Sequence, residues 1–557
     1  MAERAVFTYQ TRLALDAAQA SLLDAYAALY GQAERSLFAA LCAGRAVNEL
    51  KREFLPRFGL TARQFNAIRG GLEGKIESIK RRQPELIAQA KQRIQKAESV
   101  IAKLSARAAG SSKLHQKKRR LSTLKARCAS MESDHASGKV RLCFGSKRLF
   151  RAQFDLAANG YANHAQWQED WHAARSSQFF VLGSGDETAG NQSCQARLES
   201  EATFGLRLRL PDALAGTVGG KTLEISGVRW AYGHEAIAAA LSSSQRVHAQ
   251  TKEGKPTIKR VGSALSYRFV RDEKGWRVFV STQVAPVECV TRSALGAIGV
   301  DINADHLAVS ETDRFGNLVR SRRIDLVTYG KTSHQAKARI GDAVALIAAQ
   351  AKTAGKPVVV ERLDFQKKKA EMETASPWQA RMLSSFSYRQ VLTHLKAACF
   401  RYGVEVIEVN PAYTSVIGAV NHAQRHGISV HLGAAFAVAR RGLGLSERAP
   451  KRAAVVPLRN GGHVTFVLPV RNRAKHVWSH WASVRTKLKA AHAARMPGRV
   501  RLKPRPRLCF RQRKQCALTG HSRRDSLTRI ALNTVRRASG QTSRGERRWL
   551  SMEVGTA

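Results

Sequence analysis

The chain has 557 residues, 44% of them apolar, which excludes a wholly disordered protein and leaves room for several folded domains. It carries 93 Lys and Arg against 42 Asp and Glu, a formal net charge of +51. This surplus predicts a polyanionic partner, nucleic acid rather than a membrane surface, because each neutralised phosphate releases counterions. The N-terminal residues lack the apolar run of a signal peptide, and no stretch reaches the roughly 18 apolar residues of a membrane span, so we expect an intracellular, soluble protein.

The eight cysteines do not follow the spacing of a zinc site or a disulfide framework. No two of them have the two-residue gap of a zinc knuckle, and a chain of this size does not need disulfides. Cys509 and Cys516 could be combined with His521 into a metal site. Scattered reduced thiols are the preferred interpretation.

Taken in chain order, the first half predicts one strand, a helical region and a β-rich region. Residues 5–15 alternate apolar and polar side chains, as a strand does, and residues 16–133 show the 3.6-residue spacing of helices, with a run of cations over 113–127. From 139 to 290 the sequence favours a β-rich domain, for which a barrel is one form, and the opening strand can belong to it. Its predicted strands are KVRLCFG, SQFFVLGSG, FGLRLRLP, KTLEISGVRWAY and the hairpin SYRFVRDEKGWRVFVSTQV with its DEKG turn.

Residues 294–445 have the pattern of an α/β domain. Three strands (AIGVDI, HLAVSET and LVRSRRIDL) are followed by a helix over 333–354, the strand KPVVVERLDF, the helix SYRQVLTHLKAACFRYG, the strand VEVIEVN and a last helix over 431–441. Three meandering strands and then alternating helices and strands are the order of a ribonuclease-H fold. Beyond 446 the chain is strongly basic: residues 451–557 hold 26 Lys and Arg against three acids. We expect a nucleic-acid-binding extension there, partly disordered when free, with one strand in GHVTFVLPV and one helix in VWSHWASVRTKLKAAHAAR.

Two carboxylates close apolar strands of the α/β domain. Asp301 follows AIGV, and Glu361 follows KPVVV. In a ribonuclease-H topology these strands are neighbours, so both carboxylates would face one point, where Mg²⁺ finds the oxygen ligands it prefers. Two such ions would clamp the attacking and leaving oxygens of a phosphodiester. The alternative is that the two acids merely cap loops.

The same segment resembles the RuvC-like domain of transposon-encoded TnpB proteins and their descendants, the type V CRISPR effectors. GAIGVDINADHLAVSETDRFGN resembles their first RuvC motif, VVVERLDFQKKK the second, VEVIEVNPAYTSVIG the following strand and loop, and AAFAVARRG the final helix. The resemblance implies a multidomain α+β protein with Asp301 and Glu361 as catalytic residues and metal ligands. It also implies these domains: the first strand of a β-barrel-like wedge domain (1–15), a helical recognition lobe (16–138), the β-rich remainder of the wedge domain (139–293), a RuvC-like ribonuclease-H-fold domain (294–445) and a basic C-terminal extension (446–557).

Two departures from the family pattern bear on function. The Tyr-Thr-Ser segment normally leads into a four-cysteine zinc knuckle, but Tyr413, Thr414 and Ser415 are followed by VIGAVNHAQRHG, so we expect no zinc. Aligning the last helix places His431 where the third catalytic aspartate stands, and no acid lies between Val409 and Gly444. Imidazole is a poor ligand for Mg²⁺, so we expect reduced or abolished DNA cleavage. The alternatives are that His431 supports one metal ion, or that it only caps its helix.

The resemblance implies an RNA-guided protein that recognises a short flanking motif, pairs its guide RNA with double-stranded DNA and blocks transcription or replication of the target. It implies a monomer in the prokaryotic cytoplasm, at the nucleoid when target-bound, with no membrane partner. The alternatives are an active Mg²⁺-dependent endonuclease using Asp301, Glu361 and His431, an RNA-independent transposition enzyme of the same fold, and a structural RNA-binding protein. The predicted nucleic-acid contacts are Lys117, Lys118, Arg119, Arg120, Lys367, Lys368, Lys369, Arg440, Arg441, Arg511, Arg513 and Lys514.

Overall fold

The computed structural model describes residues 5–107, 110–216, 220–250, 256–362, 388–458 and 461–494. These residues fall into two compact units, one formed by the chain up to 411 together with 438–445, the other by 412–437 and the chain from 446 onward. Over the described ranges, no helix combines the length and the apolar character needed to cross a bilayer.

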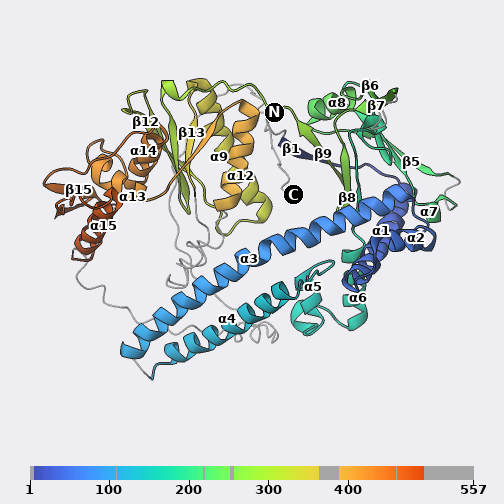
Figure 1. Ribbon diagram of the computed structural model, residues 1–557, viewed down its shortest axis with the longest axis horizontal. Helices are drawn as coiled ribbons and strands as arrows, with labels where there is room; N and C mark the ends of the chain where they lie inside the picture. The colour runs from blue at the N-terminus through green and yellow to red at the C-terminus, as the bar shows by residue number, and fades with distance from the viewer. Residues whose placement is uncertain are drawn as a thin grey trace, which may run out of the picture. The chain divides into compact units, whose positions relative to one another are not determined.

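The first unit begins with antiparallel sheets and the helices packed on them (Figure 1). A four-stranded sheet has the order β1-β9-β8-β2, a three-stranded sheet the order β3-β4-β5, and β6 pairs with β7. The strands are β1 (Ala5–Arg12), β2 (Gln178–Val181), β3 (Cys194–Leu198), β4 (Phe204–Arg209), β5 (Thr222–Val228), β6 (Gln245–Gln250), β7 (Pro256–Val261), β8 (Ser266–Asp272) and β9 (Gly275–Val284). The predicted membership of the opening strand is confirmed, because β1 pairs with β9 along its whole length.

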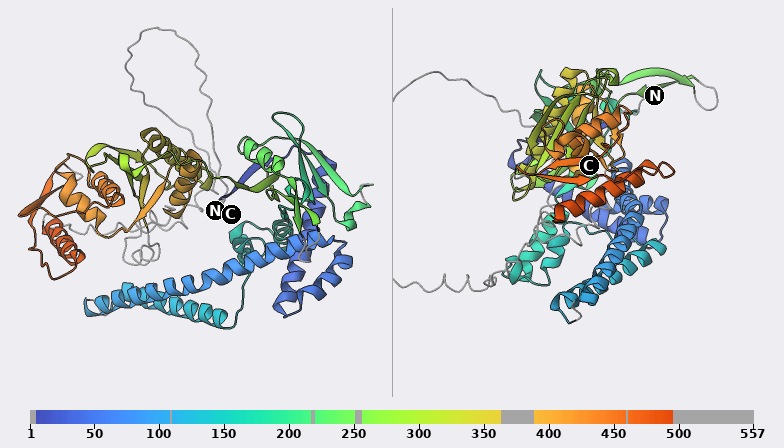
Figure 2. Two further views of the ribbon diagram at one scale, coloured as in Figure 1. Left: turned by 45° about the horizontal axis from the view of Figure 1, so that its top comes forward. Right: turned by 90° about the vertical axis from the view of Figure 1, so that its left-hand side faces the viewer.

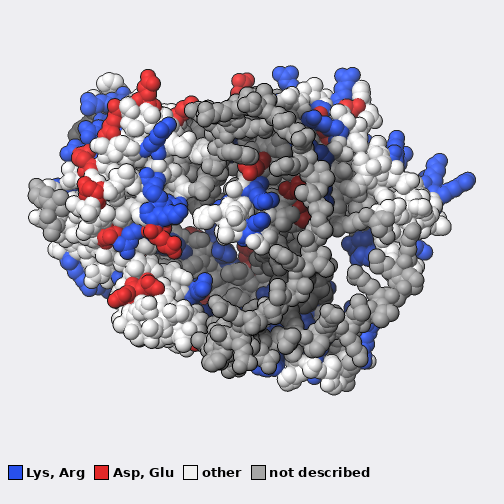
Figure 3. Space-filling view, turned by 180° about the vertical axis from the view of Figure 1, so that it is seen from behind, with Lys and Arg blue, Asp and Glu red and all other residues white. Residues whose placement is uncertain are grey.

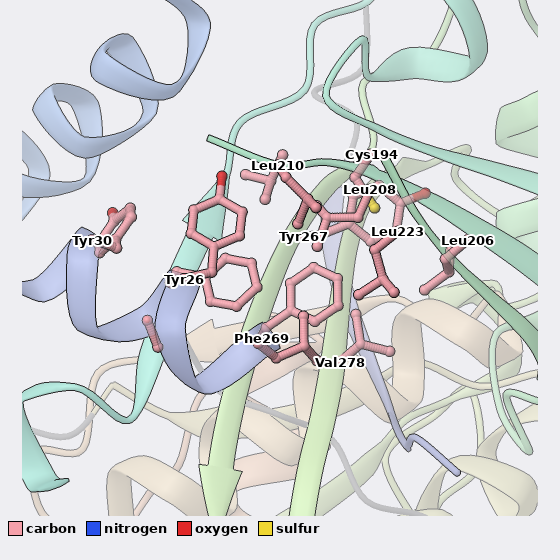
Figure 4. Close-up of a cluster of buried hydrophobic side chains, with 14 of the residues drawn as sticks. Tyr26, Tyr30, Cys194, Leu206, Leu208, Leu210, Leu223, Tyr267, Phe269 and Val278 are labelled. Atoms are coloured by element: carbon pink, nitrogen blue, oxygen red, sulfur yellow. The ribbon is translucent and has the colours of Figure 1, made fainter. Parts of the chain in front are cut away.

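One hydrophobic core joins these sheets to the first helices (Figure 4). It contains Leu23 and Tyr26 of α1 (Ala17–Cys42), residues of α2 (Val47–Phe58) and of the first part of α3 (Ala62–Arg107), and the inward side chains of the sheets. Tyr26 stacks on Phe179 with ring centroids 4.2 Å apart, and Phe179 stacks in turn on Phe269. The helix α1 starts at a capping box in which Asp16 and Gln19 exchange hydrogen bonds with each other's backbone.

Beyond this core, α3 continues as a long helix with α4 (Ser112–Ala136) beside it, as Figures 1 and 2 both show. A small apolar cluster that includes Ile87 and Cys128 holds the two helices together. Two ion pairs cross between them, Lys91 to Glu132 at 2.8 Å and Lys125 to Glu98 at 2.7 Å. The helices predicted for residues 16–133 are therefore confirmed.

Parts of the β-rich prediction are wrong. Residues 139–145 form no strand, because Phe144 packs edge-on against Phe38 and Gly145 adopts a left-handed φ of +88°. Three helices follow within the region predicted as β-rich, α5 (Lys147–Ala152), α6 (His164–Arg175) and α8 (His234–Ser242), together with the short α7 (Asp212–Ala215). The strand pairings of the described residues do not close into a barrel. Between the sheets, the buried Asn191 side chain donates to the carbonyl of Leu265 and accepts from the backbone of Cys194, in place of a continuous ladder.

The α/β domain has a five-stranded sheet of order β12-β11-β10-β13-β14. The strands β10 (Ile298–Ile302), β11 (His306–Thr312) and β12 (Leu318–Asp325) are antiparallel neighbours, whereas β13 (Val358–Glu361) and β14 (Val406–Val409) run parallel to β10. This is the strand order predicted above, and the domain is ribonuclease-H-like by its topology. The helix α9 (Ser333–Ala354) matches its predicted limits, with a capping box at Thr332 and a left-handed C-cap at Gly355.

The two faces of this sheet are covered differently. Apolar side chains of α9 and of α12 (Tyr388–Tyr402) pack on Ile298, Val300 and Val360. On the other face, Val359 packs against Val438 and Ala439, which belong to the C-terminal half of α14 (Val430–Gly442). Gly442 approaches so closely that an added Cβ would lie 2.4 Å from Val359. The central strands β10 and β13 are therefore buried on both sides, as apolar parallel strands require.

The second unit has its own core, built from Val416, Val456 and Trp481 among others. After Tyr413 the chain forms α13 (Thr414–Ile417) and a π-helical turn over Gly418–Ala423, then the first half of α14. The hairpin β15 (Ala453–Pro457) and β16 (His463–Val467) and the helix α15 (Val477–Ala494) complete it. The strand and the helix predicted for this segment are both confirmed.

Candidate functional site

The candidate site lies at the carboxyl ends of β10 and β13, where the two predicted carboxylates are brought together. The strands are parallel neighbours, with Gly299 opposite Val359 and Val300 opposite Val360. Continuing this register by one residue places Asp301 beside Glu361. Side chains directly opposite each other in adjacent strands point to the same face of a sheet, so both carboxylates project together.

The face onto which they project follows from strand alternation. Val300 and Val360 point toward α9 and α12, so the residues next to them point to the opposite side, the face on which Val359 meets Val438. Asp301 is 8% exposed, and Glu361 is half-buried. Asn303, two residues beyond Asp301, donates its side-chain amide to Asp301 Oδ2 at 3.0 Å and so orients the carboxylate.

Tyr388, at the start of α12, belongs to the electrostatic surroundings of Asp301. Burial raises the pKa of Tyr388, and the charges of Asp301 and Asp305 raise this pKa further. Its hydroxyl therefore stays protonated at neutral pH and can donate. For Asp305, burial opposes ionisation, but hydrogen bonds from His306 and Arg323 outweigh it and lower the pKa. Tyr388 thus senses two carboxylates, of which Asp305 is already paired with Arg323.

A third acid of this sheet, Glu311, lies at the opposite end of the β10–β11 pair and serves another purpose. It is 6% exposed and pairs with Lys356 Nζ at 2.7 Å and with Arg320 Nε at 2.7 Å. Burial alone would raise the pKa of Glu311, but these two cations outweigh it and lower the pKa. The charge of Glu311 is therefore neutralised in a structural ion pair. The candidate site is confined to the other end of the β10–β11 pair, at Asp301.

The donor set at the Asp301 end fits Mg²⁺ in part. Magnesium is commonly held by one or two protein carboxylates, with water and phosphate oxygens completing its octahedron, and Asp301 and Glu361 would supply the two carboxylates. The described residues contain no group of three or more His, Cys, Asp or Glu side chains placed to hold a metal. A bound Mg²⁺ would polarise a phosphodiester and lower the pKa of a bound water.

His431, the predicted third position, belongs to the second unit, where it lies half-buried in the first turn of α14. It precedes Val438 of the same helix by seven residues, or about two helical turns, and so shares the face of α14 on which Val438 lies. Its catalytic role remains a prediction.

The predicted nucleic-acid contacts fall into three groups. On α4, Lys118, Arg119 and Arg120 are exposed, whereas Lys117 is half-buried. At the end of α14, Arg440 donates to the carbonyl of Gly316 and Arg441 to that of Asn410, so both guanidinium groups contribute to holding the domain together. Lys367, Lys368, Lys369, Arg511, Arg513 and Lys514 lie outside the described residues. Nucleic-acid contact by all of these residues remains a prediction.

Figure 3 bears on how the charge is distributed over one face of the molecule. Lys and Arg side chains are scattered over its described surface, and Asp and Glu side chains lie among them. That face does not present one continuous basic patch. The excess of basic residues is concentrated instead in one pair of helices. Residues 80–127, which include most of α3 and α4, contain 15 Lys and Arg against two acids.

Sequence reasoning did not identify the residues that support the two carboxylates. Asn303 could have been found, because an amide two residues after a strand-end acid is a common local hydrogen-bond partner. Tyr388 could not, because it reaches the neighbourhood of Asp301 only through the packing of α12. In the segment expected in relatives to be a zinc knuckle, His422 Nε2 instead forms a hydrogen bond, 3.0 Å long, with Glu447 Oε1, which follows α14.

Comparisons with known proteins find only distant likenesses. No family model matches the chain, and no curated protein matches it. Among solved structures, "T. thermophilus RuvC in complex with Holliday junction substrate" is similar at a TM-score of 0.20 and 16% identity, over 28% of this chain and 98% of that one. A Cas12f1–sgRNA–target DNA complex is similar at a TM-score of 0.20 and 11% identity, over 65% of this chain and 94% of that one. A CRISPR–Cas12f ternary complex is similar at a TM-score of 0.18 and 11% identity, over 79% of this chain and 100% of that one. Likenesses this weak establish no shared architecture, and the fold assignment rests on the strand order.

Proposed function

We propose that this protein is an RNA-guided double-stranded DNA-binding effector whose RuvC-like site cleaves DNA weakly or not at all. The observation that carries the proposal is the convergence of Asp301 and Glu361 on one face and one end of a ribonuclease-H-like sheet, in a chain with a net charge of +51. A surplus of cations supports nucleic-acid binding. The resemblance of the sequence motifs around both carboxylates to those of RNA-guided proteins supports guidance by RNA.

The reduced cleavage is inferred from the ligand chemistry. Asp301 and Glu361 provide oxygen donors, but His431 at the third position would provide a neutral nitrogen, which hard cations accept poorly. Two-metal hydrolysis depends on anionic ligands that hold both ions against the scissile phosphate. With one such ligand missing, the protein would remain bound to its target and block transcription or replication.

In the proposed complex the chain's own residues do three things. Asn303 orients the Asp301 carboxylate, Tyr388 offers a protonated hydroxyl near it, and the basic residues of α4 neutralise phosphates. Sequence specificity would come from base pairing between guide and target strand, with the protein recognising a flanking duplex motif.

The test is to purify the protein with its bound RNA, sequence that RNA, and incubate the complex with matched duplex DNA and Mg²⁺. We expect a gel shift that depends on the match to the RNA, without strand cleavage. A shift that ignores sequence, or the absence of a discrete RNA, would rule out RNA guidance and favour a structural RNA-binding protein or an RNA-independent transposition enzyme.

The role of His431 is tested by His431→Asp, which restores an anionic ligand. We expect cleavage of matched DNA to appear or to rise at least tenfold, the usual order for a metal-site interaction, and to be abolished again in His431→Asp/Asp301→Ala. His431→Asn is the matched control, because it restores no charge. Equal cleavage by the Asp and Asn variants would contradict the assignment of His431.

An active Mg²⁺-dependent endonuclease is the second candidate, and the retained pair of buried-strand carboxylates favours it. It predicts that the unmodified protein cuts matched DNA and that Asp301→Ala and Glu361→Ala each abolish cutting while the gel shift persists.

A further inference from the structure

A pocket in the first unit, lined only by residues from the first half of the chain, has the chemistry of a nucleobase site. It has a volume of about 230 Å³ and lies where α1 and α3 meet the edge strand β2. Its lining comes from Tyr30 and Glu34 on α1, Gly71 and Lys75 on α3, Gln178, Phe179 and Phe180 on β2, and Arg268 on β8. The volume is below that of pockets for drug-sized ligands, so it suits a single base rather than a larger molecule.

A buried carboxylate is among the residues that line the pocket. Glu34 is 6% exposed, and among the described residues its hydrogen-bond partner is Lys75 Nζ, which contacts Oε1 at 2.6 Å. A buried carboxylate accepts more than one hydrogen bond readily, because it has two oxygens with about four acceptor positions. Among the described residues no hydrogen bond involves Oε2, and Glu34 lines the pocket, so a ligand with adjacent N–H groups can donate to this carboxylate. The neighbouring Tyr30 hydroxyl stays protonated, because burial and the charge of Glu34 raise its pKa.

The walls supply a stacking surface and cationic donors. Phe180 lies directly opposite Arg268 in the β2–β8 pair, so the half-buried ring and the exposed guanidinium share one face of the sheet. The guanidinium already lies over the Phe279 ring, 5.0 Å from its centroid, which limits its freedom. Tyr30 lies on α1 to one side of the buried cluster around Tyr267 and Phe269 (Figure 4). A flat ligand can thus stack on Phe180 with donors and an acceptor around its edge.

We propose that this pocket binds one unpaired guanine base of a bound nucleic-acid strand, a proposal that rests on the nucleic-acid binding proposed above. Guanine presents two adjacent N–H donors on one edge, which match the Glu34 carboxylate, and the O6 and N7 acceptors on another, which match arginine or lysine. Uracil has one N–H donor on its Watson–Crick edge, and adenine lacks the carbonyl oxygen that arginine reads. The strand can be RNA or DNA, since these contacts involve only the base.

Two adjacent glycines of α3 give a matched test. A Cβ on Gly71 would lie 3.4 Å from the Tyr30 hydroxyl and 3.9 Å from Phe180, so Gly71→Met extends a side chain into the pocket without removing a polar group. A Cβ on Gly70 would meet nothing within 4 Å, and Gly70→Met on the same helix is the control. Both residues have right-handed helical backbone, which tolerates a side chain. Circular dichroism verifies that both variants fold.

The full-length protein, freed of bound RNA by nuclease and high salt, is titrated with fluorescent oligonucleotides of about ten nucleotides, within the range of one single-strand site. The probes are an all-uridine RNA, the same RNA with one central guanosine, adenosine or cytidine, and the corresponding deoxythymidine set. We expect guanine to lower Kd about tenfold, as one well-formed bidentate contact does. Gly71→Met should abolish this gain, and Gly70→Met should keep it. Glu34→Gln should reduce it.

The outcomes separate the pocket from the proposed function. A guanine gain in the RNA set, the DNA set or both supports the pocket and assigns the strand it reads. Salt-sensitive binding of all probes with equal Kd, a preference for another base, or a gain that survives in folded Gly71→Met overturns the pocket and leaves the proposed function standing. If the protein bound none of the probes, both the guanine pocket and the proposed nucleic-acid binding would be overturned.

Discussion

At the scale of single residues, Glu311 shows what a buried carboxylate of this sheet does when it is not at the candidate site. Its partners, Lys356 and Arg320, hold it ionised although it is buried. Removing the Glu311 charge leaves the ammonium group of Lys356, whose side chain is 12% exposed, without compensation. We therefore expect Glu311→Gln to destabilise the α/β domain by about 2–3 kcal/mol at pH 7. Glu77→Gln, in the exposed pair with Arg81, should change stability by no more than about 0.5 kcal/mol.

The same pair has a predictable pH dependence. Burial would raise the pKa of Glu311, but its cations lower it below the ordinary value of 4.5. A depressed folded-state pKa means that the stabilisation is complete above the unfolded-state value and is lost as pH falls through the folded-state value. Hydrogen exchange of the β10 and β11 amides, compared between wild type and Glu311→Gln, should show the full difference at pH 7 and a smaller one below about pH 4. A difference that does not change with pH would contradict the ionised pair.

The candidate site divides by residue into what the sequence could predict and what it could not. Asp301 and Glu361 were predictable because an acid that ends an apolar strand has few structural uses, and neighbouring parallel strands bring such ends together. The ion pairs of Glu34 and Glu311 were not, since their lysine partners lie 41 and 45 residues away along the chain. Only the packing of α1 on α3, and of β11 on the α9–β13 connection, brings those charges into contact.

At the scale of elements, the contact between the π-helical turn and α14 depends on two glycines of the second unit. A Cβ on Gly433 would lie 2.5 Å from the carbonyl oxygen of Gly418, and one on Gly418 would lie 2.3 Å from the backbone nitrogen of Ala434. Both obstacles are backbone atoms, which cannot move aside like a side-chain end. Gly433→Ala should therefore cost about 1–3 kcal/mol through overpacking.

The control for that substitution is Gly74→Ala, in the middle of α3, where an added Cβ would meet nothing within 4 Å. There the methyl group should stabilise the protein by about 0.5–1 kcal/mol, because alanine loses less backbone entropy than glycine in a helix. Thermal unfolding of the full chain compares the two variants. Equal shifts of Tm in the same direction would contradict the close approach of the two elements.

Elements with long, regular patterns were predictable, and short ones were not. The helix over 333–354 was found from its periodicity, and the hairpin over 266–284 from its alternation and its DEKG turn. Residues 139–145 alternate like a strand but pack Phe144 on α1 instead. The helices α5 and α8 are six and nine residues long, too short for the 3.6-residue spacing to separate them from the surrounding strands.

At the scale of the whole molecule, the sequence predicted a strongly basic, multidomain protein with a ribonuclease-H-like sheet. It did not predict that α1, α2 and the start of α3 share one core with the antiparallel sheets, because that core joins Leu23 to Val280 across most of the first half of the chain. The predicted domain limits remain a prediction. Because the start of α3 is packed in this shared core, the basic α3–α4 pair is anchored to the antiparallel sheets through the first turns of α3.

That arrangement makes the α3–α4 pair a defined surface for measuring phosphate contacts. Lys118 and Arg119 are exposed on α4, whereas Lys91 and Lys125 are each paired with a glutamate of the neighbouring helix. If the exposed pair neutralises phosphates, Lys118→Ala/Arg119→Ala should weaken binding to single-stranded RNA of any sequence. It should also reduce the slope of log K against log salt by about 0.7 for each phosphate that is no longer neutralised, hence by about 1.4.

Lys91→Ala/Lys125→Ala removes the same amount of charge, one lysine from α3 and one from α4, and is the control. Because both lysines already have carboxylate partners, their removal frees two acids and releases no additional counterions from the nucleic acid. The affinity can then fall through the altered net charge, but the slope should change by less than that of the α4 variant. Fluorescence anisotropy over a series of salt concentrations gives both slopes. Identical slopes for the two variants would mean that the charge of the α3–α4 pair acts only as a diffuse field, with no phosphate held at Lys118 or Arg119.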